Sequence, residues 1–81
     1  MPSTSLPISE QIASLLAPYI GQFNAQMWVK SVTRRELGLA PEELTSQQIP
    51  TVVDGLRPYL QTLMGRATAE DLLLQITREV R

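Results

Sequence analysis

The sequence predicts an all-α fold, a four-helix domain of two helical hairpins with proline-kinked first and third helices. Three observations predict it. Apolar residues recur at steps of three and four, glycines follow several of these runs, and no segment alternates apolar and polar residues for long enough to form a strand. A chain of 81 residues has room for one hydrophobic core, so we expect a single domain.

The first helix is expected to follow a flexible leader. Residues 1–7 hold two prolines and three hydroxyl residues, which is typical of such a leader, and the helical domain is expected over residues 8–81. Ser9 is the expected N-cap. The apolar face of this helix is expected to contain Ile12, Leu15, Leu16, Tyr19, Ile20 and Phe23.

A second apolar run extends from Phe23 to Leu37 and stops at Gly38, a residue that readily adopts the left-handed conformation of helix C-termini. The run is apolar on more than one side. We therefore expect this helix either to be central in the bundle or to be covered in part by another molecule. The segment LAPEEL, residues 39–44, predicts a connector with one helical turn that starts at Pro41.

The third and fourth helices are predicted by their starts and their stripes. Thr45 and Gln48 fit a capping box, and Gly65 is expected to end the third helix. Thr68 with Asp71 predicts a similar start for the fourth helix. The expected apolar stripes are Ile49, Val52, Val53, Leu56, Leu60 and Leu63 in the third helix and Leu72, Leu73, Ile76 and Val80 in the fourth.

A sequence echo relates the two halves. The segment LAPYI, residues 16–20, recurs as LRPYL, residues 56–60. We expect two similar hairpins about a pseudo-twofold axis, with chance similarity of amphipathic helices as the alternative. Pro18 and Pro58 cannot donate a backbone hydrogen bond and are expected to bend their helices. We interpret the bends as shaping the core, and the alternative is a bent groove that accepts a partner.

Composition argues against catalysis. Seven basic and eight acidic side chains give a net charge of −1, so no long-range field favours nucleic acid or an anionic membrane. The chain has no cysteine and no histidine, which removes the thiol nucleophile, the commonest general base and the usual ligands of zinc, haem and copper. We expect no enzyme activity, no catalytic residue, no cofactor and no metal site. Glu42, Glu43, Glu70 and Asp71 are expected to complement helix N-termini.

The side chains expected to bind a partner lie mainly on the second helix. Large apolar side chains at helical spacing are usually core, but this helix offers more apolar surface than a monomer of this size can bury. The basic residues of this helix, Lys30, Arg34 and Arg35, are typical of a solvated helix end. They are also typical of a docking patch for an acidic partner or for a phosphate backbone. The residues expected at the partner site are Tyr19, Met27, Trp28, Lys30, Arg34, Arg35 and Tyr59.

The stretch LLAPYIGQFNAQMWVKSVTRR resembles small helical modules at the ends of bacterial signalling proteins, including serine/threonine kinases. Tyr19-Ile20-Gly21 and Val29-Lys30 match the pattern of these modules, while Gln22 stands where they carry proline. The resemblance covers about a quarter of the chain and implies a non-catalytic regulatory or assembly module.

We therefore expect a protein–protein interaction module of bacterial signalling, cytoplasmic because no membrane span or secretory signal is evident. The sequence predicts a protein partner without identifying it, and a homodimer formed through the second helix is one alternative. The alternative function is that of a small DNA-binding transcriptional regulator, which would use the same helix although nucleic acid is the less expected partner.

Overall fold

The computed structural model describes residues 6–80. Within this range the chain forms four α-helices and two short 3-10 turns, and no strand, so the all-α prediction is confirmed. The elements are α1 (Ile8–Ile20), α2 (Gln22–Leu37), η1 (Pro41–Glu43), η2 (Ser46–Gln48), α3 (Ile49–Met64) and α4 (Arg66–Glu79). Of the predicted leader, residues 1–5 lie outside the described residues, and Leu6 and Pro7 precede α1.

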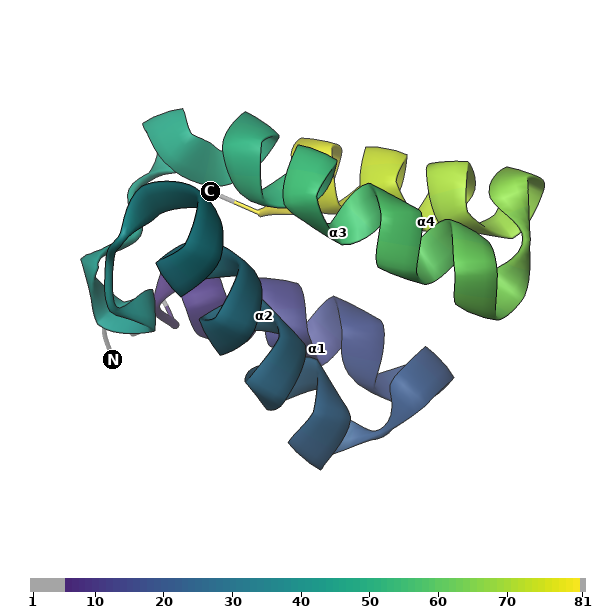
Figure 1. The fold of residues 1–81 in the computed structure, drawn as a ribbon, viewed down its shortest axis with the longest axis horizontal. Coiled ribbons are helices and arrows are strands. Elements are labelled where there is room, and N and C mark those ends of the chain that lie inside the picture. Colours follow the sequence, from purple (N-terminus) through teal and green to yellow (C-terminus); the bar gives the residue numbers. More distant parts are fainter. Residues whose placement is uncertain (1–5, 81) are drawn as a thin grey trace, which may run out of the picture.

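The four helices form two hairpins. α1 packs on α2 and α3 packs on α4, and the hairpins meet mainly through α2 and α3. In Figure 1 the pair α1–α2 lies below the pair α3–α4, and the hairpins diverge toward the side on which each of them turns back. The largest fully buried apolar side chains of the core between them have no more than 1% of their surface exposed, namely Ile12, Leu16, Val29, Val32, Val52, Leu56, Leu60, Leu72, Leu73 and Ile76.

Each hairpin turns at a single glycine. Gly21 has φ 88° and ψ 153°, and Gly65 has φ 85° and ψ 161°, a backbone region that is essentially restricted to glycine. The Gly21 N–H donates to the Ala17 carbonyl (2.8 Å), and the Gly21 carbonyl accepts from the Ala25 N–H (2.9 Å). Gly65 makes the same two bonds in its own hairpin, with Gln61 and Ala69. One residue therefore ends a helix and starts the next, and we call these two residues the turn glycines.

The turn glycines give the internal repeat a different spacing from that of the sequence echo. The prolines are forty residues apart, whereas Gly21 and Gly65 are 44 apart, a difference of about one helical turn. Burial follows the longer spacing at five pairs of positions. The equivalent buried pairs are Ile12 and Leu56, Leu16 and Leu60, Ala25 and Ala69, Val29 and Leu73, and Val32 and Ile76. Thus the repeat is one of turn and core positions, and the two prolines occupy different turns of their helices.

Two predicted helix starts are wrong. α1 begins at Ile8 with Pro7 as its N-cap, because the Pro7 carbonyl accepts from the Glu10 and Gln11 N–H groups (3.0 Å each), and Ser9 lies buried in the first turn. α4 begins directly after Gly65, so Thr68 lies inside it and not at a capping box.

Three other predicted signals are confirmed. Gly38 adopts the left-handed conformation and donates to the Arg34 carbonyl (2.9 Å). The connector turn begins at Pro41. The Gln48 side-chain carbonyl accepts from the Thr45 N–H (3.0 Å).

Three side chains assigned to apolar stripes are exposed. Tyr19, Phe23 and Leu63 have 50%, 74% and 55% of their surface exposed. The assignment of Phe23 assumed that the face of the first helix continues past residue 20. Because the chain reverses at Gly21, Phe23 belongs to α2 and points away from the core.

Thr33 is a buried polar side chain in α2. It is fully buried, and its hydroxyl has no hydrogen-bond partner among the described residues. A buried unpaired hydroxyl destabilises the folded state because it has lost its hydrogen bonds to water. We expect Thr33→Val to raise the free energy of unfolding by about 1 kcal/mol in urea denaturation. As a control, Thr62→Val removes an exposed hydroxyl that donates to the Pro58 carbonyl (2.9 Å), and it should give no gain.

A charged cluster joins α3 to α4. The Arg57 Nε donates to Glu70 Oε2 (2.8 Å), and its Nη1 donates to Asp54 (2.6 Å), the local pair that helix spacing favours. The Gln61 side chain also donates to Glu70 (3.0 Å). Glu70 therefore bonds to the neighbouring helix, where the sequence suggested only a complement to a helix N-terminus. The hydrogen bond from Arg57 lowers the pKa of the Glu70 carboxyl below its usual range.

This lowered pKa makes a small part of the stability dependent on pH. Because the folded pKa of Glu70 lies below the unfolded one, the contribution is present above about pH 4.3 and is lost as the pH falls through the folded pKa. We expect Glu70→Gln to be less stable than the wild type at pH 7 and nearly equal to it at pH 2. Urea denaturation at the two pH values measures this, and Arg57→Gln should behave in the same way. A difference that grows on acidification would contradict the assignment.

Candidate functional site

Large apolar side chains are exposed around the turns of the hairpins. Tyr19 lies two residues before Gly21 and Phe23 two residues after it, while Leu63 lies two residues before Gly65. We define the turn-end surface as these three residues together with Trp28 and Tyr59. Tyr59 is 42% exposed, while Trp28 is half-buried against the core. Small soluble domains seldom leave so many large apolar side chains together in water.

A groove of about 410 Å³ opens within this surface, on the side where the hairpins diverge in Figure 1. Its lining consists of Tyr19, Ile20, Asn24, Trp28, Leu63 and Met64. Two of these residues end α1, two end α3 and two belong to α2. The groove therefore lies between the hairpins and depends on how they are packed against each other.

The repeat explains the composition of the groove. Tyr19 and Ile20 precede Gly21 as Leu63 and Met64 precede Gly65, so the last turns of α1 and α3 supply equivalent apolar pairs. Because a turn glycine ends each helix abruptly, these side chains cannot be covered by a further turn of their own helix. The two turns therefore leave these apolar side chains uncovered at the ends of α1 and α3.

One hydrogen bond and one aromatic contact hold Asn24 and Trp28 in place. The Asn24 side chain donates to the Ile20 carbonyl (3.0 Å), one of the carbonyls at the end of α1. The Trp28 and Tyr59 rings lie 5.6 Å apart between centroids, tilted by 47°, a favourable aromatic geometry. The Trp28 ring is therefore held between the core and α3.

Arg35, on α2, lies at the edge of the site and contacts Tyr59. Its guanidinium carbon lies 5.2 Å from the centre of the Tyr59 ring, and its Nη1 donates to the Tyr59 hydroxyl. Its Nε pairs with Glu36 (3.2 Å). The hydrogen bond to Tyr59, followed by the one to Glu36, raises the pKa of Arg35 further above its usual value, so the side chain remains charged at any physiological pH.

The structure brings together four of the seven residues expected at a partner site. Tyr19 and Trp28 line the groove, and Tyr59 and Arg35 border it next to Trp28. The other three, Met27, Lys30 and Arg34, are exposed on the outer face of α2. Lys30 also lines a depression with Glu10 on the side of α1, away from the groove. Partner binding by these seven residues stays a prediction.

Sequence reasoning missed most of the apolar lining. Leu63 and Phe23 were assigned to the core, and Ile20, Asn24 and Met64 were not expected at a site. One signal could have found them. Side chains within three residues of a glycine that ends a helix lie where the next helix must turn back, and four groove residues have this position before Gly21 or Gly65.

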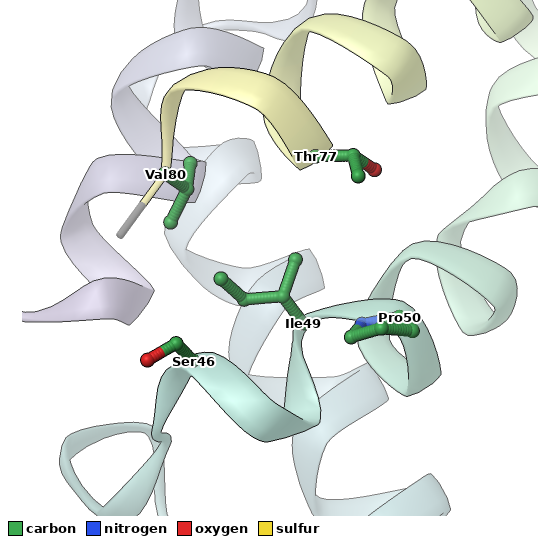
Figure 2. Close-up of a pocket in the computed structure, with 5 residues that line it drawn as sticks. All are labelled: Ser46, Ile49, Pro50, Thr77 and Val80. Atoms are coloured by element: carbon green, nitrogen blue, oxygen red, sulfur yellow. The ribbon is translucent and has the colours of Figure 1, made fainter.

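A second hollow lies at the opposite end of α3. Its volume is about 370 Å³, and it is lined by Ser46, Ile49, Pro50, Thr77 and Val80. Figure 2 shows Ile49 and Val80 extending toward the same space from α3 and from the end of α4. The Thr77 hydroxyl donates to the Leu73 carbonyl (3.0 Å), and no charged side chain lines the hollow. It therefore offers less for recognition than the turn-end surface.

The described part of the chain offers little chemistry for metals or membranes. No group of three or more acidic side chains gathers within residues 6–80 in a way that could bind a metal ion. None of the described helices has both the length and the apolar character that a membrane crossing requires. The groove itself presents aromatic, aliphatic and amide groups, which can bury an apolar ridge and orient it through hydrogen bonds.

Comparisons with known proteins give no assignment. A scan of the chain against protein-family models finds no match, and searches of curated proteins and of solved structures find none either. The resemblance to helical modules of bacterial signalling proteins therefore stays a prediction.

Proposed function

We propose that this chain is a non-catalytic protein–protein interaction module, of a regulatory or assembly kind, that binds its partner through the turn-end surface. The observation that carries the proposal is one apolar groove in whose lining Tyr19 and Leu63 are at least half exposed, with Phe23 and Met27 also exposed on α2. Water contact with such side chains is unfavourable by about 25 cal/mol per Å² of apolar surface, and a bound partner would remove it.

The chemistry of the groove supports a binding role. Its six lining residues have no carboxylate, amine, thiol or imidazole group that could transfer a proton or attack a substrate. Aromatic side chains such as Trp28 and Tyr59 are typical anchors of protein interfaces. The proposal includes a cytoplasmic location and a role in bacterial signalling, which rest on the sequence pattern alone.

A capture experiment with matched leucine variants tests the proposal. Leu63 in the groove and Leu74 on α4 are both 55% exposed, so replacing either of them by glutamine removes the same side chain at the same exposure. Tagged wild type, Leu63→Gln and Leu74→Gln are each used to capture proteins from an extract of the source organism. We expect a partner that is retained by the wild type and by Leu74→Gln and is lost with Leu63→Gln.

Salt separates this function from DNA binding. Binding driven by apolar burial should persist at 1 M salt, whereas affinity for a phosphate backbone falls steeply as the salt concentration rises. Circular dichroism of each variant confirms that it is folded. Equal capture by Leu63→Gln and the wild type, or binding only to DNA at low salt, would contradict the proposal.

A further inference from the structure

We propose that the outer side of the first hairpin binds a second copy of this chain in a twofold dimer. The site is a shallow groove between α1 and α2, which we call the seam groove. Two hollows of about 260 and 220 Å³ share Glu10, Ala13 and Gln26, so they form one continuous groove. Within the described range, none of the lining residues belongs to α3 or α4, and none lines the groove of the turn-end surface.

The two sides of the seam groove differ in the size of their side chains. The α1 side is a row of small residues one helical turn apart, namely Ser9, Ala13 and Ala17. The α2 side is a row of long polar residues with the same spacing, namely Gln22, Gln26 and Lys30. Ser9 and Lys30 line one hollow, Ala17 and Gln22 line the other, and Ala13 and Gln26 line both. The small row and the long row are therefore in register along the groove.

A buried hydroxyl lies in this groove without a partner. Only 8% of Ser9 is exposed, and the residue lines the same hollow as Lys30. Its hydroxyl makes no hydrogen bond with another described residue, and neither do the side-chain amides of Gln22 and Gln26. A hydroxyl that has lost most of its contact with water is unfavourable until a polar group reaches it. The small row therefore suits long polar side chains that fill the groove and bond to Ser9.

A twofold axis along the seam groove brings the unlike sides together. Such an axis places α1 of one copy opposite α2 of the other, at the same level along the groove. Ala13 then faces Gln26 of the second copy, and Ala17 faces Gln22 of the second copy. Because α1 and α2 run antiparallel within each hairpin, the four helices of the dimer alternate in direction, as in an antiparallel four-helix bundle.

The charges on this face favour the same arrangement. Glu10 and Lys30 line one hollow, both are exposed, and neither forms an ion pair with another described residue. Within residues 6–80 no other charged side chain lines the seam groove. The twofold axis brings Glu10 of each copy opposite Lys30 of the other, so the dimer contains this pair twice. Met27, which is 50% exposed and one turn from Lys30, is covered at the edge of the interface.

A second copy fits the seam groove better than other occupants do. The face itself carries both complementary rows and both charges, so a copy supplies every complement by symmetry. An apolar helix would bury the amides of Gln22 and Gln26 without hydrogen bonds. A phosphate backbone would meet the carboxylate of Glu10 beside the single cation of the groove.

The mass of the protein across a concentration series is the first measurement. The interface is small and largely polar, so the dimer should be weak, with a dissociation constant of about 10–100 μM at low salt. Sedimentation equilibrium from about 1 μM to about 1 mM should show the mass rising from that of the monomer to that of the dimer. Leu63→Gln changes only the other groove and should leave the dissociation constant at the wild-type value.

Charge-reversal variants assign the dimer to the seam groove. Glu10→Lys and Lys30→Glu each place two like-charged pairs in the dimer, so each should weaken it at least about tenfold at low salt. When the two variants are mixed, each pair between them again joins opposite charges. The mixture should therefore form a heterodimer at a concentration at which each variant alone is a monomer. This difference should shrink at 0.5 M salt, because exposed charges are screened.

Matched variants on α4 control for net charge. Glu79→Lys and Arg78→Glu make the same two changes of charge beside another hollow, away from the seam groove. Each should dimerise as the wild type does, and mixing them should give no preference for a heterodimer. Circular dichroism of all four variants confirms that they are folded.

Each contrary result overturns the inference. A monomer mass up to about 1 mM would refute it, as would a dimer that tolerates both charge reversals or a mixture that forms no heterodimer. A dimer that Leu63→Gln dissociates would place the second copy on the turn-end surface instead. The capture experiment with the leucine variants concerns the other groove, so it decides the proposed interaction function separately.

Discussion

Gly65→Ala is expected to lower the free energy of unfolding by about 1–3 kcal/mol, and Gly21→Ala by a similar amount. An added Cβ would meet no atom within 4 Å at either position, so the loss comes from backbone conformation and not from a steric clash with a neighbour. Both glycines have φ near 85° with an extended ψ, which side chains of L-residues do not tolerate. Because a domain of this size has about 3–5 kcal/mol of stability, the double variant should be largely unfolded. Urea denaturation measures all three.

Two controls test whether the loss of stability comes from backbone strain at the turn glycines or from any substitution of a glycine. Gly38 has φ 68° and ψ 21°, a left-handed conformation that asparagine adopts readily, so Gly38→Asn should change stability little. The chain is short enough for chemical synthesis, and D-alanine at position 65 should be tolerated because its stereochemistry favours positive φ. If L-alanine at position 65 were as stable as D-alanine, the single-residue turn would not be required.

Gly55→Ala is expected to destabilise the protein by about 1–3 kcal/mol, against the usual effect of this exchange. In the interior of a helix alanine normally stabilises by about 0.5–1 kcal/mol relative to glycine. Here the new Cβ would lie 2.6 Å from Val32 Cγ1 and 3.0 Å from Glu36 Cγ, at the contact between α3 and α2. Thermal and urea unfolding of the variant measure the loss, and a gain in stability would show that the two helices do not approach so closely.

A compensating substitution tests this contact specifically. Val32→Ala alone removes buried apolar volume and should destabilise by about 1–3 kcal/mol. Combined with Gly55→Ala, it makes room for the new methyl group, so the double variant should be more stable than the sum of the single losses implies, by about 1 kcal/mol. Additive losses would contradict the contact between Gly55 and Val32.

The sequence predicts the class of the fold because apolar periodicity is a property of each helix alone. The stripe of α4, from Leu72 to Val80, and the helix ends at Gly38 and Gly65 depend only on local spacing and on glycine chemistry, and all of them are confirmed. Pairing of the helices into hairpins also follows, since short connections leave neighbouring helices antiparallel.

The turns could not be predicted, because the pattern does not show how many residues a turn takes. A glycine after a helix signals an end, but only its backbone angles show that the next helix begins at once. This is why Thr68 was expected as a cap and why Phe23 was assigned to the face of the first helix. Each error comes from reading a helix in isolation from the helix that follows it.

The site could be predicted only in part for the same reason. Trp28, Tyr59 and Arg35 are conspicuous by residue type, and the structure places them together. Leu63 and Ile20 are ordinary apolar residues in a regular stripe, and only their position just before a helix-ending glycine separates them from the core. They become part of a site only because both hairpins end beside them.

The stability of Phe23→Gln tests the central claim most directly. Tyr19, Phe23 and Leu63, next to the turns, lie on the surface and not in the core, and Phe23 is 74% exposed. In urea denaturation at low protein concentration, we expect the free energy of unfolding of Phe23→Gln to stay within about 0.5 kcal/mol of the wild-type value, as is usual for exposed positions. A loss of about 2 kcal/mol or more, comparable to that expected for the buried Leu60→Ala, would place Phe23 in the core and contradict the account.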